Sequence, residues 1–93
     1  MSVFTKVRVN EPVVTPEQIR AARAWLGWSR DDLSGKSGVS QGSIAMYEQG
    51  RSVPYDETLI KLKTALEAGG IRFHFVGSLG TGISRDLSRE DHA

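Results

Sequence analysis

Histidine is the residue type in this chain best suited to metal or acid–base chemistry, and it occurs only at His74 and His92. The chain has no cysteine, which excludes thiolate ligands and disulfides. Two isolated histidines cannot form a metal site without several carboxylates arranged around them, and no serine, histidine and carboxylate are spaced for nucleophilic catalysis. The segment from Gly80 to Gly82 suits a hairpin better than a phosphate-binding loop. We therefore expect no enzyme activity, no metal and no cofactor.

Size and composition indicate one small soluble domain. The chain has 93 residues, of which 39% are hydrophobic and 25% charged. No apolar run approaches the roughly 18 residues that a membrane span needs, and the first residues alternate in polarity, unlike a secretory signal. We expect a cytoplasmic protein with no membrane association. The net charge of +1 does not indicate a polyanionic partner, so any argument for nucleic acid must come from local arrangement.

The polar residues best placed to bind a partner surround a sharp turn, Ser37-Gly38-Val39-Ser40. Glycine allows the chain to turn, Val39 can fill the angle, and Ser40 is a good cap for a helix that continues to about residue 48. A short helix precedes the turn, because Ser29 caps it and Gly38 stops it. Two short helices joined in this way form a helix-turn-helix, which presents its second helix outward.

Two further helices are expected to support this motif. Thr15 and Pro16 mark the start of the first, which ends near Gly27. The last runs from about Asp56 to Ala68, with Leu59, Leu62 and Leu66 on one face and glycines after it.

Alternating segments flank the helices. Residues 2 to 9 fit a short strand, and residues 71 to 76 fit another. Residues 77 to 80 separate the latter from residues 81 to 85, which predicts a hairpin at the C-terminal end.

Several coordinated positions resemble the Cro and lambda-repressor (XRE) family over about residues 16 to 68: Leu26-Gly27-Trp28-Ser29, Leu33, Gly38-Val39-Ser40, Ile44, Glu48-Gln49-Gly50-Arg51 and Pro54. The resemblance implies a mainly α fold, a four-helix lambda-repressor-like helix-turn-helix domain with short terminal β-strands that form a small sheet or a dimer interface. The expected organisation is an N-terminal strand or arm (1–14), the helix-turn-helix domain (15–69), a C-terminal β-hairpin for dimerisation (70–85) and a flexible tail (86–93).

In that family the helix after Ser40 enters the major groove of duplex DNA with its first residues toward the bases. Carried over to this chain, the base-reading positions are Gln41, Gly42, Ser43 and Met46. Gln41 is the leading one, since its amide can both donate to and accept from adenine. Gly42 departs from the family pattern, because relatives often carry a base-reading side chain there. Either this position simply tolerates a small residue, or glycine is needed so that the backbone can approach the DNA closely.

The resemblance also assigns contacts to the DNA backbone. The expected phosphate-binding residues are Arg30, Lys36, Ser40 and Arg51. For each arginine and for the lysine, the alternative is an ordinary solvated side chain.

Unpaired strand edges pair readily with another chain, so we expect a homodimer. Its interface would include Ile71, Phe73 and Phe75. Two recognition helices would then lie about one duplex turn apart, roughly 34 Å, on a near-palindromic site.

The function that these observations favour is a sequence-specific DNA-binding transcriptional regulator, a repressor, that reads the major groove with residues 41 to 48. The alternative is a protein-binding module of the same fold, an antitoxin or an anti-activator, whose partner is a toxin or a larger regulator. The near-neutral charge and Gly42 favour this alternative.

Overall fold

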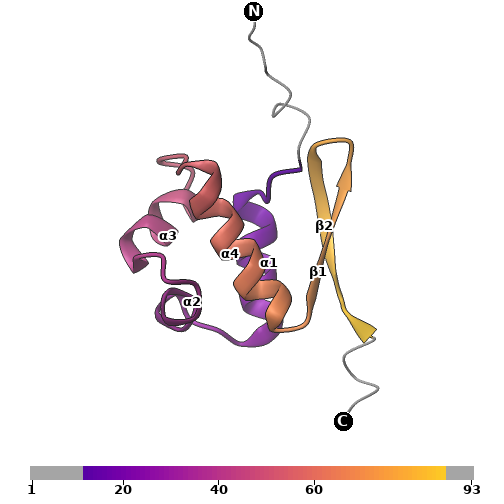
Figure 1. Cartoon of the computed structure of the whole chain (residues 1–93), viewed down its shortest axis with the longest axis horizontal. Coiled ribbons are helices and arrows are strands. Elements are labelled where there is room, and N and C mark those ends of the chain that lie inside the picture. The colour runs from indigo at the N-terminus through magenta and orange to yellow at the C-terminus, as the bar shows by residue number, and fades with distance from the viewer. Residues whose placement is uncertain (1–11, 88–93) are drawn as a thin grey trace, which may run out of the picture.

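The computed structural model describes residues 12–87, in which four helices are followed by an antiparallel hairpin (Figure 1). The elements are α1 (Pro16–Leu26), α2 (Arg30–Ser37), α3 (Gln41–Glu48), α4 (Asp56–Ala68), β1 (Ile71–Val76) and β2 (Leu79–Arg85). The predicted mainly helical fold is confirmed. The strand expected at residues 2 to 9 lies outside the described residues, as does most of the expected tail.

The first two helices begin at reciprocal side-chain caps. The Thr15 hydroxyl accepts from the N–H of Gln18 (3.1 Å), and the Gln18 side chain accepts from the N–H of Thr15 (3.0 Å). Ser29 and Asp32 repeat this arrangement at α2, with both distances 2.9 Å. Each box satisfies two backbone donors that would otherwise lack a partner in the first turn.

The core lies between the helices and takes side chains from all of them. The fully buried ones include Ile19, Leu33, Ile44, Leu62 and Leu66. Since α2 and α3 each have only eight residues, their stability depends on this packing more than on helix propensity.

The hairpin turns more tightly than the sequence predicts. β2 begins at Leu79, which pairs with Val76 across a two-residue turn at Gly77 and Ser78. Gly77 has a φ of 62°, which suits the two-residue hairpin turns whose backbone twist matches that of the flanking strands. A register shift between His74 and Phe75 then introduces a bulge.

One buried amide fixes the hairpin to the helices. The Nε2 of Gln18 donates to the carbonyls of His74 on β1 and Gly82 on β2, both at 2.9 Å. Gly80 allows this close approach, because a Cβ there would overlap the Gln18 side chain. A polar residue of α1, 3% exposed, thereby connects to both strands.

The inner face of the hairpin packs against the core of its own chain. Ile71 is 2% exposed and belongs to the core, while Phe73 and Phe75 are half-buried and pack against it. This corrects the expectation for Ile71, since a side chain buried in its own subunit is not available to a partner.

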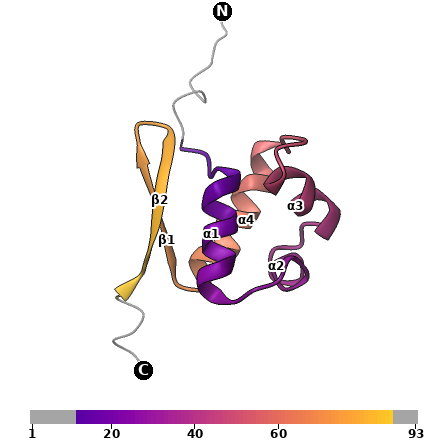
Figure 2. The same ribbon diagram turned by 180° about the vertical axis from the view of Figure 1, so that it is seen from behind.

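The helix-turn-helix and the hairpin occupy opposite sides of the molecule. α1 and α4 lie between them, and both views show α3 at one side and the β-strands at the other (Figures 1 and 2). Within residues 12–87 no helix has the length and apolar character needed to cross a membrane.

Candidate nucleic-acid interface

The turn between α2 and α3 has the expected geometry. Gly38 lies in the left-handed region with φ of 78°, and its N–H donates to the carbonyl of Ser34 over 2.9 Å. Val39 is buried beside it. The Ser40 hydroxyl accepts from the N–H of Ser43 (3.1 Å) and begins α3. The predicted helix-turn-helix is confirmed.

Helix α3 has one anchored face and one exposed face. Its buried residues are Ile44, Tyr47 and Glu48, whose spacing of three and four residues places them on one side. The four residues expected to read bases are all exposed: Gln41, Gly42, Ser43 and Met46. The structure therefore brings the base-reading candidates together on the surface.

Glu48 anchors α3 through its carboxylate, whose side chain has no exposed surface. Arg23 of α1 donates to both oxygens, Nε to Oε2 and Nη2 to Oε1, each at 2.7 Å. Arg30 of α2 donates from Nε to Oε1 at 3.0 Å. Arg20 donates to the backbone carbonyl of Glu48 at the end of α3. One residue thus joins three helices.

Charge explains how this carboxylate remains ionised inside the protein. Burial alone raises the pKa of Glu48, but the hydrogen bonds and positive charges of Arg23 and Arg30 outweigh burial, so the pKa lies below its ordinary value. The same hydrogen bond raises the pKa of Arg23. Both groups are charged over the whole neutral range.

Sequence reasoning did not find this role of Glu48 and Arg23. A signal was present, because Glu48 follows Ile44 by four residues and so shares the buried face of α3. A carboxylate on such a face requires a cationic partner, and Arg20 and Arg23 supply candidates on α1.

Tyr47 provides a second anchor on the same face. Its hydroxyl donates to the carbonyl of the buried Val14, just before α1, at 2.7 Å. Burial, together with the charge of Glu17, raises the pKa of the phenol. Tyr47 therefore supports the fold and does not face a ligand.

The four phosphate-binding candidates differ in how freely they can reach a ligand. Arg30 is one-third exposed and already paired through Nε. The ammonium of Lys36 lies 4.9 Å from the centre of the Trp28 ring, a cation–π contact. Ser40 is an exposed helix cap. Arg51 is exposed, with one long hydrogen bond from Nη1 to Oε1 of Gln49 (3.4 Å).

Nothing in residues 12–87 requires glycine at position 42. A Cβ built there would meet nothing within 4 Å, and its φ is not in the left-handed region. The same is true of Gly35 in α2. Within residues 12–87 no three metal-ligating side chains come together. The chemistry this surface can perform is hydrogen bonding and charge pairing with an external partner.

Comparison with known protein families supports this geometry. Residues 19–68, more than half of the chain, match the family described as Helix-turn-helix (HTH_3). The match includes α2 and α3 entirely and ends at the last residue of α4. No curated protein matches the chain.

Proposed function

Because the chain belongs to the XRE/Cro-type helix-turn-helix family of DNA-binding regulators, we propose that it is a sequence-specific repressor that reads duplex DNA with α3. The observation that carries this proposal is the division of α3 into two faces. Glu48 and Tyr47 fix one face to α1, α2 and the segment before α1, and the other face exposes Gln41, Ser43 and Met46. A helix that is held rigidly and exposes polar groups suits the major groove.

Base reading is assigned to the first two turns of α3. The amide of Gln41 can form two hydrogen bonds with adenine, a contact that gives about 1–3 kcal/mol of discrimination when its geometry is good. Met46, 38% exposed, can contact a thymine methyl group. Ser43 can hydrogen-bond to a base or to a phosphate.

Backbone contacts are assigned to Arg51, Lys36, Ser40 and Arg30. Arg51 is the most available, since its guanidinium is exposed just beyond α3. Arg30 has a double role in this proposal: its Nε holds Glu48, and its remaining N–H groups face a phosphate. Phosphate contacts of this kind set register and affinity but carry no sequence information.

Repression follows from occupancy, because a protein held in the major groove excludes other proteins from the same DNA. In this proposal the protein acts in the cytoplasm as a homodimer on a near-palindromic DNA site and has no enzymatic activity. Both recognition helices must face the same side of the duplex about one turn apart, roughly 34 Å.

Selection from a pool of random duplexes tests this function. The wild-type chain is expected to enrich one motif, and its affinity should fall steeply with salt. Arg51→Ala should reduce the slope of log affinity against log salt concentration by about one, without changing the selected motif. Lys61→Ala on α4 is the matched control for loss of a surface charge. Failure to enrich any motif at low salt contradicts the proposal.

A protein-binding module, an antitoxin or an anti-activator, is the second candidate. The net charge of only +1 favours it, as do the acidic residues at the starts of α2 and α4, Asp31 and Asp32 and then Asp56 and Glu57. The partner would be a toxin or a larger regulator. Specific co-purification that survives Gln41→Ala and Arg51→Ala, without any DNA preference, would decide for this function.

A further inference from the structure

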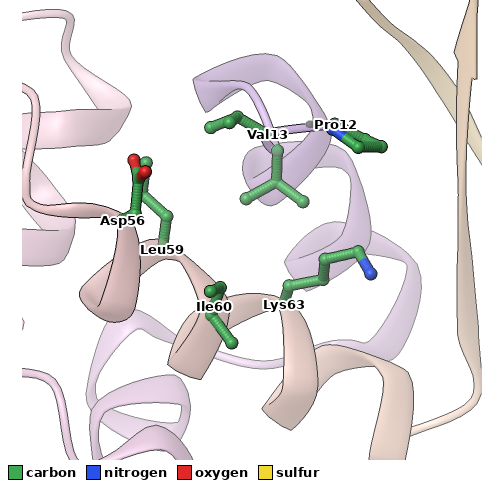
Figure 3. Close-up of a pocket in the computed structure, with 7 residues that line it drawn as sticks. Pro12, Val13, Asp56, Leu59, Ile60 and Lys63 are labelled. Carbon is green, nitrogen blue, oxygen red and sulfur yellow. The ribbon is translucent and has the colours of Figure 1, made fainter. Parts of the chain in front are cut away.

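One large apolar side chain stands on the otherwise polar outer face of α4. Ile60 is 56% exposed, whereas the buried residues of this helix are Leu59, Leu62, Ala65 and Leu66. A single exposed isoleucine is ordinary on a protein surface. Here, however, Ile60 borders a hollow that it shares with Leu59 and with Pro12 and Val13 of the segment before α1 (Figure 3).

Charged residues of opposite sign lie before and after Ile60 along α4. Glu57 precedes it by three residues and Lys63 follows it by three, so all three share one side of the helix. Acidic Asp56 also precedes it, and it lines the hollow together with Lys63 (Figure 3). This order, acid then isoleucine then base, is self-complementary when two such helices run antiparallel.

We propose that α4 pairs antiparallel with α4 of a second copy of this chain, across a two-fold axis at Ile60. Ile60 of each copy packs beside the hollow of the other. Glu57 of each copy then faces Lys63 of its partner, which gives two identical ion pairs. A two-fold interface requires this kind of self-complementarity, and an unrelated partner does not.

The position of α4 relative to α3 favours this surface over the hairpin. The loop after α3 leads directly into the start of α4, whereas the hairpin lies on the far side of α1 and α4 (Figure 1). Ile71 is also buried in its own subunit. Because α4 packs against α2, an α4 interface lies nearer the helix-turn-helix than the hairpin does. This inference extends the proposed DNA-binding function, but its test needs no DNA.

Cross-linking through a new cysteine locates the axis, since the natural chain has no cysteine. The full chain carrying Ile60→Cys is expected to form disulfide-linked dimers on mild oxidation at high protein concentration. Val76→Cys, at a site 70% exposed near the hairpin turn, is the matched control and should link more slowly. Faster linking through position 76, or equal rates at both sites, overturns the proposal.

A charge swap tests the pairing itself. Glu57→Lys and Lys63→Glu should each raise the dimer dissociation constant at least about threefold, because each places like charges opposite one another twice. The two substitutions together should restore it. Sedimentation equilibrium measures these constants, and thermal unfolding of each variant checks the monomer, in which Lys63 also pairs with Glu67 (3.0 Å). The pairing is overturned if the single variants leave the dimer dissociation constant unchanged, or if the double variant dimerises more weakly than either single variant. Loss of DNA selection with intact cross-linking would instead contradict only the proposed function.

Discussion

The helix-turn-helix and the hairpin are held to the rest of the molecule by different kinds of interaction. α3 is held by ionised and hydroxyl groups at its C-terminal end, through Glu48 and Tyr47. The hairpin is held by one neutral amide, Gln18, and by apolar side chains against the helices. The ionic anchor leaves the N-terminal turn of α3 exposed, while the hairpin buries its inner face. The difference supports our proposal that the exposed turn of α3, rather than the inner face of the hairpin, meets an external ligand.

Removing the ionic anchor should have the largest effect. Glu48→Gln leaves Arg23 and Arg30 without a carboxylate in a largely buried site, and we expect a loss of about 3 kcal/mol in the free energy of unfolding. Urea titration measures this loss. Glu67→Gln is the matched control, because its exposed pair with Lys63 contributes at most about 0.5 kcal/mol. Equal losses in the two variants would show that Glu48 does not anchor α3.

Acid should weaken the same anchor without any substitution. The folded-state pKa of Glu48 lies below its unfolded value, so its contribution is complete above the unfolded pKa and is lost as pH falls through the folded pKa. We expect unfolding free energy to fall with acid over that window in the wild-type chain. The slope should be smaller in Glu48→Gln. Identical acid slopes in the two chains would contradict this assignment.

The hairpin attachment should be sensitive at one glycine and tolerant at another. Gly80→Ala forces a Cβ into the Gln18 amide, and we expect a loss of about 1–3 kcal/mol. Gly82→Ala on the same strand meets nothing within 4 Å and serves as the control. Hydrogen exchange should locate the change in the hairpin and leave α3 protected. A perturbation that reached α3 equally would show that the two regions are not separate.

The smallest expected effect concerns a glycine on the surface that we propose reads DNA. Gly42→Ala should raise the free energy of unfolding by up to about 1 kcal/mol, since alanine favours helix and the site is open. If α3 approaches DNA closely there, affinity for the selected site should fall. Gly35→Ala in α2 is the matched control and should stabilise the chain with no change in affinity. Unchanged affinity in Gly42→Ala would argue for simple tolerance of glycine.

The sequence predicted most of the fold because its signals are local. Caps at Thr15, Ser29 and Ser40 and the stop at Gly38 act within a few residues of the boundaries they set. The exposed face of α3 followed from the same spacing. The Glu48 anchor and the attachment of the hairpin by Gln18 were not predicted, because both join residues at least 18 positions apart. The burial of Ile71 depends likewise on how the strand docks.

The central claim, that the exposed face of α3 reads bases, is tested most directly by comparing the motifs selected by two glutamine variants. Gln41→Ala should lose preference at one base pair of each half-site while the other positions remain. Gln49→Ala, at the opposite end of α3, should select the wild-type motif. An unchanged motif in Gln41→Ala, or the same loss in Gln49→Ala, would contradict the account.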